Sequence, residues 1–372
     1  MRDALAERLL AEVMGWAPED VARERPDLQA LAAYKYDEYQ QFFPGMRFVE
    51  SLALWLSQFR TIEERRIAYD FIKSKLIFCS SAEMDHLVSI AYPDYVRPLL
   101  LRGAAHDAGI GERLVSRIAA STAFKVRQRQ CLFLGLSDGA RIDVFRRSNS
   151  SDLTHEQILQ TYEVTAERVD ELLKKLSADL VLLLGGEPPE AMRKFRTIVL
   201  LDDFSGSGFT YLRRGEGGSF DGKIGKFYRS VTAPEGPASR LVDINGAEIF
   251  LVLYMATEQA RQRLEALSKE MWEPLGVQQW VMVVHELGDS IRVRPDDGNR
   301  MAKLIDTYYD PEVADEHTRK GGTDDVKYGF GYCGLPLVLS HNTPNNSLSV
   351  LWAHTNKVRA LFPRVSRHKK EA

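Results

Sequence analysis

One segment of the chain places two acids directly before a loop of glycines and hydroxyl residues. Asp202 and Asp203 follow the apolar run 198–201, and the loop after them contains Ser205, Gly206, Ser207, Gly208 and Thr210. Carboxylates accept hydrogen bonds from the vicinal hydroxyls of a ribose, while glycines let backbone amides turn towards a phosphate that Ser and Thr hydroxyls also bind. This order of residues predicts a sugar-phosphate site. A solvated strand-to-helix turn is the alternative interpretation.

The position of the acids relative to the apolar run supports a ligand site. Four consecutive apolar residues predict a buried strand, and ligands of open α/β sheets bind outside the carboxyl ends of the strands. A Walker-type phosphate loop is excluded because no Lys follows the glycines. A dinucleotide-binding fingerprint is excluded because the acids precede the loop.

A second candidate is the polar turn after the apolar run 131–136, which contains Ser137, Asp138, Gly139 and Arg141. Gly139 allows a strained backbone, and the Arg141 guanidinium can form charge-assisted hydrogen bonds to a phosphate. An ordinary turn is the alternative. Arg146 and Arg147 lie just beyond and are either a phosphate contact or a solvated pair.

A third candidate is the segment 328–348, which is dense in Gly, Pro, Asn and aromatic residues. This composition predicts a shaped loop whose amides and imidazole can contact an acceptor molecule, namely His341, Asn342, Asn345 and Asn346. A rigid loop in which Asn side chains cap backbone groups is the alternative. The other histidines show no metal-ligand spacing, so no metal site formed by the chain itself is predicted.

The elements that must position these residues follow from hydrophobic patterning. Apolar runs predict strands at 131–136, 198–201, 248–254 and 280–285. One helix is predicted at about 257–269. Another is predicted from Thr154 to Leu176, because Gln157 stands in capping-box register with Thr154. Periodicity leaves open whether residues 180–184 continue that helix or form a strand. Buried strands that alternate with helices predict a mainly parallel α/β sheet.

Three regions are expected along the chain: a helical N-terminal region at 1–122, an α/β domain at 123–355 and a basic C-terminal tail at 356–372. In the first region, Thr61 with Glu64 and Ser80 with Glu83 match capping boxes. The aromatic residues between 34 and 48 are interpreted as packing rather than as a base-stacking surface. The tail is interpreted as a solvated terminus, with nucleic-acid contact as the alternative.

Composition excludes several classes of protein. The 372 residues, 44% of them apolar, suffice for a large core. The formal net charge of −3 excludes a global basic field for nucleic acid or anionic membrane. An odd number of cysteines, Cys79, Cys131 and Cys333, favours a reducing compartment, and no apolar run reaches the roughly 20 residues of a membrane span. We therefore expect a cytoplasmic protein.

The segment 198–210 resembles the motif by which type I phosphoribosyltransferases bind phosphoribosyl pyrophosphate (PRPP). That motif is an apolar strand, two acids, three variable residues, Ser or Thr, Gly, a variable residue and Thr. Asp202 and Asp203 match the acidic pair, and the loop matches at Ser207, Gly208 and Thr210. Phe209 departs from the small residue that the family often has, which would reshape the phosphate loop.

The resemblance implies a fold and an activity. The fold is α/β, with a type I phosphoribosyltransferase-like, mainly parallel sheet flanked by helices and a helical N-terminal region. In the family, Mg²⁺ is held through PRPP, the acidic pair fixes the ribose, and a loop after the first core strand holds the pyrophosphate. On this chain, the phosphate and ribose contacts would be Asp202, Asp203, Ser205, Gly206, Ser207, Gly208 and Thr210, and the pyrophosphate loop would be Ser137, Asp138, Gly139 and Arg141. The resemblance gives catalytic roles to Asp202, Asp203 and Arg141.

The segments 134–143 and 334–348 are similar to a narrower group, the phosphoribosyltransferase-like proteins of bacterial conflict systems, some of which accompany retrons. This resemblance implies an anti-phage effector that transfers ribose 5-phosphate from PRPP to an acceptor, which the sequence does not identify. Its partners would be a reverse transcriptase and the RNA or DNA product of that enzyme. The alternative is a PRPP or nucleotide sensor, or a complex subunit, without turnover. Oligomerisation is left open.

Overall fold

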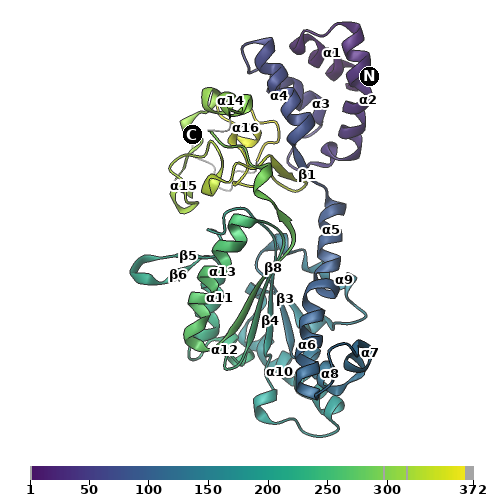
Figure 1. Ribbon diagram of the computed structural model, residues 1–372, viewed down its shortest axis with the longest axis vertical. Coiled ribbons are helices and arrows are strands. Elements are labelled where there is room, and N and C mark those ends of the chain that lie inside the picture. Colours follow the sequence, from purple (N-terminus) through teal and green to yellow (C-terminus); the bar gives the residue numbers. More distant parts are fainter. Residues whose placement is uncertain (1, 296–297, 316, 365–372) are drawn as a thin grey trace. The chain divides into compact units, whose positions relative to one another are not determined.

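The structure is a computed structural model that describes residues 2–295, 298–315 and 317–364. These residues form two compact units (Figure 1). The first unit consists of the described residues within 1–83 and 288–372, and the second consists of residues 84–287. The predicted boundary at 122/123 therefore falls inside the second unit, and the predicted domain 123–355 includes parts of both units.

A parallel five-stranded sheet forms the centre of the second unit. Its strand order is β3-β2-β4-β7-β8, and each neighbouring pair is parallel. The strands are β2 (Cys131–Gly135), β3 (Ile158–Gln160), β4 (Thr197–Ser205), β7 (Glu248–Thr257) and β8 (Gln278–Leu287). This arrangement confirms the predicted parallel α/β sheet, and the last three strands are longer than their apolar runs indicated.

Helices cover both faces of this sheet. Side chains of one face, such as Leu132 and Ile198, share a buried cluster with residues of the helices α10 (Ala166–Leu184), α11 (Lys223–Thr232), α12 (Pro237–Leu241) and α13 (Glu258–Trp272). On the other face, the Tyr92 ring packs edge-on against Phe133, with 5.8 Å between ring centroids. Tyr92 precedes α6 (Arg97–Ala108), and the helical segment 84–122, which the sequence analysis assigned to the N-terminal region, belongs to the unit that contains the sheet. The second unit also contains α7 (Val115–Ala120), α8 (Thr122–Arg129) and α9 (Ile142–Ser148).

The predicted helix that begins at Thr154 is wrong in its first half. The capping interaction forms, with the Thr154 amide 3.2 Å from Gln157 Oε1, but it supports only the short 3₁₀ turn His155–Gln157. The Gln157 side chain then donates to the carbonyls of Gln128 and Cys131, at 2.7 and 2.8 Å. These bonds fix the chain beside the sheet, which it enters as β3. The helix begins only at Ala166, and it continues through residues 180–184.

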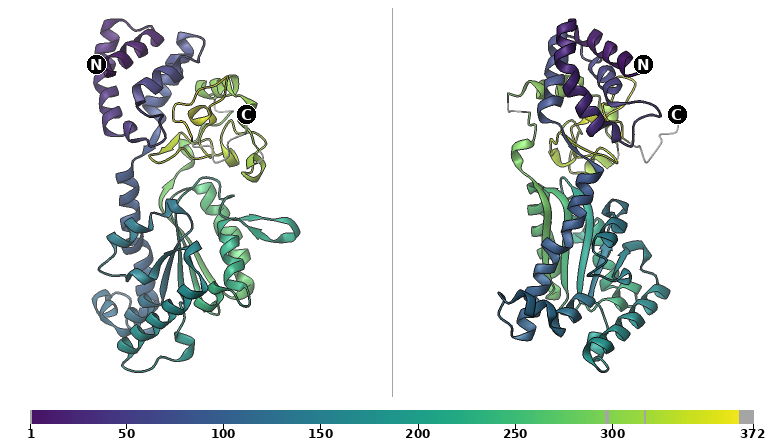
Figure 2. Two further views of the ribbon diagram at one scale, coloured as in Figure 1. Left: turned by 180° about the vertical axis from the view of Figure 1, so that it is seen from behind. Right: turned by 90° about the vertical axis from the view of Figure 1, so that its right-hand side faces the viewer.

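A short antiparallel hairpin separates β4 from the next helix. Its strands are β5 (Arg213–Arg214) and β6 (Phe220–Asp221), and it projects away from the sheet (Figure 2). The chain passes directly from this hairpin into α11. The loop after the acids is therefore followed by a hairpin instead of a helix.

The first unit combines both ends of the described chain. The parallel pair β1 (Ile77–Cys79) and β9 (Leu337–Leu339) joins them. Its helices are α1 (Arg2–Met14), α2 (Pro18–Tyr34), α3 (Phe48–Leu56), α4 (Ile62–Lys75), α14 (Arg300–Tyr308), α15 (His317–Lys320) and α16 (Ser349–Trp352), and α5 (Ser81–Ile90) leads into the second unit. The predicted capping boxes are confirmed. The Glu64 amide donates to the Thr61 hydroxyl, and the Ser80 amide donates to the Glu83 carboxylate.

The aromatic residues of the N-terminal region are mostly packed, as predicted. Tyr36, Tyr39 and Phe48 are buried against Phe362 near the C-terminal end of the described chain. Tyr34 and Phe43 are different, because 89% of Tyr34 and 53% of Phe43 are exposed. None of the described helices has the length and apolar character needed to cross a membrane.

Candidate functional site

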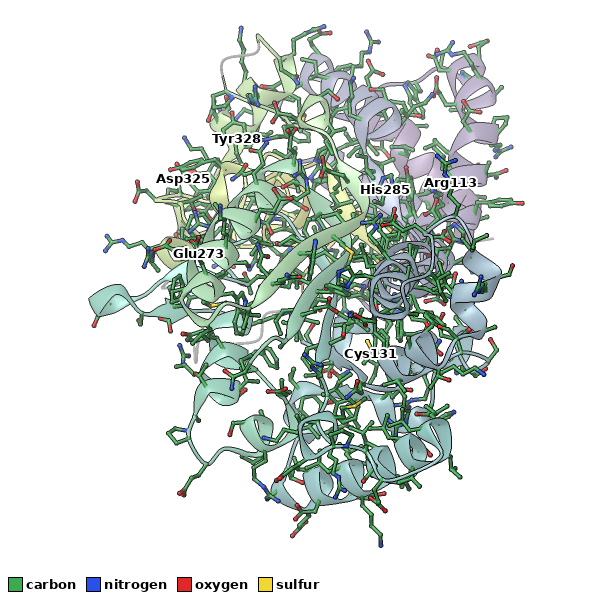
Figure 3. All side chains as sticks on the ribbon, turned by 60° about the horizontal axis from the view of Figure 1, so that its bottom comes forward. Arg113, Cys131, Glu273, His285, Asp325 and Tyr328 are labelled. Carbon is green, nitrogen blue, oxygen red and sulfur yellow. The ribbon has the colours of Figure 1, made fainter. Side chains whose placement is uncertain are left out.

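The acidic pair lies near the carboxyl end of β4, at the middle of the sheet. Asp202 aligns with Leu253 of β7, and Leu136, just after β2, donates its amide to the Leu201 carbonyl at 2.9 Å. Figure 3 labels Cys131 and His285, which lie at the amino end of β2 and near the carboxyl end of β8. The acids belong to the same end of the sheet as His285, because Phe204 and His285 both align with Met255.

Asp202 is fully buried, and both of its carboxylate oxygens accept hydrogen bonds. The Ser137 hydroxyl donates to Asp202 Oδ1 at 2.6 Å, and the Asp203 amide donates to the same oxygen at 3.1 Å. The ammonium of Lys223 forms an ion pair with Oδ2. The structure thus connects the acidic pair to the turn after β2, and the family resemblance implies that both contact the same ligand.

The charge of Asp202 depends on these partners. Burial, and next the neighbouring Asp203 carboxylate, raise the pKa of Asp202 above its ordinary value. The Lys223 ammonium and the Ser137 hydroxyl act in the opposite direction, because both interact with the ionised form. Lys223 is therefore the cation that favours an ionised Asp202.

Gly139 lies directly against the second acid. A Cβ atom on Gly139 would be 2.5 Å from Asp203 Oδ2, so only glycine allows this approach. The expectation that Gly139 carries a strained backbone is wrong, because the left-handed conformation in this turn belongs to Arg141, with φ 45°. The glycine is needed for space.

Arg141 is held by the second unit itself. Its guanidinium donates to Asp85 Oδ1 of α5 at 2.6 Å. The preceding carbonyl, of Ala140, accepts a hydrogen bond of 2.8 Å from the buried Tyr254 hydroxyl of β7. Asp138 begins the 3₁₀ turn Asp138–Ala140 between the strand and Arg141. The predicted pyrophosphate turn is thus anchored to the sheet.

The loop after the acids closes as a tight turn. Gly208 has φ 78°, and its carbonyl accepts hydrogen bonds from the amides of Tyr211 and Leu212 at 3.0 and 2.9 Å. The Gly206 carbonyl accepts from the Thr257 hydroxyl. Ser207 is buried, and Thr210 is exposed. Ser205 is also buried, and within the described residues its hydroxyl has no hydrogen-bond partner.

Phe209, the departure from the family motif, has a specific neighbour. The Arg263 guanidinium of α13 lies 3.7 Å from the centre of the Phe209 ring. Burial lowers the pKa of Arg263. A Cβ on Gly208 would lie 3.1 Å from the same arginine side chain. Phe209 therefore fixes the loop against α13.

Lys223 is the site residue that sequence reasoning missed. It is the first residue of α11, on the far side of the hairpin from the motif. Its amide donates to the Thr210 carbonyl at 3.1 Å. A lysine at a helix start carries no motif, so only the fold could place it beside Asp202.

The third predicted segment lies in the first unit, whereas the acids lie in the second. Its polar side chains mostly hold the segment's own backbone. Asn346 donates to the Phe330 carbonyl at 2.8 Å, and Asn342 Oδ1 accepts from the Thr343 amide at 3.0 Å. The backbone carbonyls of His341 and Asn345 accept hydrogen bonds from Gln41 and Phe330, respectively. These contacts fit the shaping alternative.

The basic candidates are also placed. Arg147 pairs with Asp143 on the surface, as a solvated pair would, and Arg146 donates to the Ile158 carbonyl at 2.9 Å. Arg146 also lines a groove of about 650 Å³ beside β3, whose lining contains neither acid of the pair. Residues 365–372 of the predicted basic tail lie outside the described residues.

A parallel sheet with an acidic pair at the end of its central strand, followed by a glycine and serine loop, defines a phosphoribosyltransferase-like α/β protein. The model of the PRTase-CE family, in which PRTase stands for phosphoribosyltransferase, matches residues 52–364. The chain belongs to this family, which confirms the resemblance to phosphoribosyltransferases. No curated protein and no solved structure matches the chain.

Proposed function

We propose that the protein binds PRPP at the carboxyl end of β4 and transfers its ribose 5-phosphate to a nitrogen nucleophile. The observation that carries this proposal is the meeting of two separate motifs, because Ser137 and Gly139 contact the acidic pair directly. Family membership supports a phosphoribosyltransferase-like function in general.

The described contacts suggest which residues would bind each part of the ligand. Asp203 is partly exposed, so its carboxylate can accept hydrogen bonds from ribose hydroxyls. The loop from Ser205 to Thr210 would hold the 5-phosphate. The Ser205 hydroxyl, which has no hydrogen-bond partner in the part of the chain that the structure describes, is a donor that a ligand can satisfy. Arg141 would clamp the pyrophosphate after exchanging its Asp85 contact for a phosphate oxygen.

Mg²⁺ would be held mainly by the ligand. This ion prefers oxygen ligands and commonly binds through substrate phosphates, waters and one or two carboxylates. Within the described residues, no group of three or more His, Cys, Asp and Glu side chains is arranged to hold a metal. Asp203 is the partly exposed carboxylate that fits an ion carried by PRPP. The ion would neutralise charge on the pyrophosphate.

The proposed reaction breaks the bond between the ribose C1 and the pyrophosphate oxygen. Pyrophosphate leaves with the bonding electrons, and positive charge develops on the sugar. The carboxylates at the end of β4 stabilise this charge electrostatically. The nitrogen lone pair of the acceptor then forms the new bond to C1, and the acceptor nitrogen loses a proton.

Calorimetry with PRPP and Mg²⁺ tests the binding step, with ribose as a control ligand that lacks phosphates. We expect saturable binding of PRPP and no measurable binding of ribose. Pyrophosphate release in the presence of fractionated cell extract then tests transfer. A folded protein that does not bind PRPP would contradict the proposal.

A PRPP sensor without turnover is the second candidate. The ion pair of Arg141 with Asp85 favours it, because the guanidinium must exchange this contact before it can bind a leaving pyrophosphate. Arg141→Ala separates the two. In an enzyme, the contact to the leaving pyrophosphate strengthens as the C1 bond breaks, so the substitution lowers pyrophosphate release more than PRPP affinity. In a sensor, affinity alone falls. Arg147→Ala, in an exposed pair, is the matched control. If neither quantity changes in Arg141→Ala, the turn after β2 does not bind pyrophosphate.

We further propose that the protein is an effector of bacterial anti-phage defence. The similarity of the segments 134–143 and 334–348 to conflict-system proteins supports this role. Cells that express the wild-type chain, together with its neighbouring genes, should form fewer phage plaques than cells that express Asp203→Ala. Equal plaque numbers, at equal protein levels, would refute the defence role and leave PRPP binding unaffected.

A further inference from the structure

Lys223 is attached to the end of the proposed phosphate loop by its backbone. Its amide donates to the Thr210 carbonyl at 3.1 Å. The preceding residue, Gly222, has φ 98°, and a Cβ there would be 2.5 Å from the Tyr211 carbonyl oxygen. Only glycine permits this close approach of two backbone segments. The start of α11 is thus fixed against the loop.

The side chain of Lys223 connects the loop to the acidic pair. Its ammonium pairs with Asp202 Oδ2 and lies 4.7 Å from the centre of the Tyr211 ring. The Asp202 side chain is 0% exposed, whereas the Lys223 side chain is 26% exposed. Of the two side chains in this pair, only that of Lys223 is partly exposed.

Asp202 and Lys223 also differ in their capacity for further hydrogen bonds. Both carboxylate oxygens of Asp202 already accept hydrogen bonds, from Ser137, the Asp203 amide and Lys223. An ammonium group has three N–H donors, and the Asp202 contact uses one of them. Lys223 can therefore bind a second anion without releasing Asp202.

We propose that Lys223 binds the 5-phosphate of the ligand on the loop 205–210, and that Asp202 acts through Lys223 as its positioning residue instead of touching the ligand. This inference rests on the proposed function and adds a cation to it. The loop contains no lysine or arginine of its own between Ser205 and Thr210. Lys223, the first residue of α11, supplies a positive charge beside the loop.

The test compares four variants with the wild type: Lys223→Met, Lys223→Arg, Asp202→Asn and the double variant Asp202→Asn/Lys223→Met. Lys226→Met is the matched control, because Lys226 is exposed on the same helix. The double variant avoids an unpaired buried carboxylate, which could prevent Lys223→Met from folding. Thermal unfolding followed by circular dichroism establishes that each variant is folded.

Ribose 5-phosphate is the main probe because it carries the 5-phosphate without the pyrophosphate. We expect Lys223→Met to weaken its binding in calorimetry about tenfold or more, as for the loss of a charged hydrogen bond. Lys223→Arg should retain more affinity than Lys223→Met, and Lys226→Met should bind as the wild type does. The double variant should bind as weakly as Lys223→Met alone, because Asp202 and Lys223 act as one unit.

Three outcomes would overturn the inference. If folded Lys223→Met binds ribose 5-phosphate and PRPP as tightly as the wild type, Lys223 is not a ligand contact, although the proposed function stands. If the losses of Asp202→Asn and Lys223→Met multiply in the double variant, Asp202 touches the ligand independently. If the wild type binds neither PRPP nor ribose 5-phosphate, the proposed function and this inference fail together.

Discussion

Asp202 and Asp203 are neighbours in the chain with different surroundings. Successive residues of a strand face opposite sides of the sheet. Asp202 is fully buried and paired with Lys223, whereas Asp203 is partly exposed and lies against Gly139. Two carboxylates in such different environments are suited to different tasks, one inside the protein and one towards a ligand.

Asp203→Ala should weaken PRPP binding by more than tenfold while the fold survives. The substitution removes charged hydrogen bonds to the ribose, which contribute about 1.5 to 3 kcal/mol each. Calorimetry measures the change, and Asp143→Ala, an acid of similar type in an exposed ion pair, is the control. Equal affinity in both variants would remove Asp203 from the ligand site.

The stability of the protein should depend on the ionisation of Asp202. Burial, followed by the Asp203 carboxylate, raises its folded-state pKa above the ordinary value of 3.8. The folded state then holds the proton more tightly than the unfolded chain does. This contribution to the free energy of unfolding is fully present below pH 3.8 and is lost as pH rises through the raised pKa.

Asp202→Asn should remove that part of the pH dependence. Urea unfolding at several values between about pH 4 and about pH 7 gives the slope for each protein. We expect the free energy of unfolding of the wild type to fall more steeply with pH than that of the variant. Parallel slopes would show that the Lys223 pair compensates the burial of Asp202 completely.

The shape of the turn after β2 depends on the absence of a side chain at Gly139. Gly139→Ala places a methyl carbon 2.5 Å from Asp203 Oδ2, which is too close for the two atoms to pack. We expect the turn or the carboxylate to move and PRPP affinity to fall, with a measurable loss of thermal stability. Gly111→Ala is the control, because a Cβ there meets no atom within 4 Å. Unchanged affinity in folded Gly139→Ala would separate this turn from the ligand site.

Local sequence predicts elements and motifs better than it predicts contacts between them. The apolar run 198–201 and the acids after it located β4 and the carboxyl end of the sheet, because the residue types change from apolar to charged at that point. The capping box at Thr154 forms as predicted, yet no long helix follows it. The hydrogen bonds of Gln157 to the carbonyls of Gln128 and Cys131 hold the chain beside the sheet, where it forms β3. Lys223 could not be predicted, because its pairing with Asp202 depends on the hairpin that brings α11 back to β4.

At the scale of the whole chain, the first unit depends on residues from both ends. The Phe362 ring packs against Tyr36, Tyr39, Phe42, Phe48 and Phe78. Phe362 is fully buried, so its aromatic contacts join the C-terminal segment to the N-terminal helices. The parallel pairing of β1 with β9 adds backbone hydrogen bonds between the N-terminal and C-terminal parts of this unit.

Phe362→Ala should therefore destabilise the first unit by about 3 to 5 kcal/mol, the usual cost of removing a buried ring. Tyr34→Ala, at an exposed aromatic of the same unit, should change the free energy of unfolding by no more than about 0.5 kcal/mol. Urea unfolding followed by fluorescence measures both. Similar effects of the two substitutions would contradict the packing role of Phe362.

The pairing of β1 with β9 also sets an order of events during protein synthesis. Residues 77–79 leave the ribosome long before their partner strand, because the whole second unit is translated between them. At about 5–20 residues per second, that interval is on the order of 10–60 s. During it, the apolar surface of the N-terminal helices has no C-terminal segment to cover it, which makes the nascent chain a substrate for chaperones until residue 362 emerges.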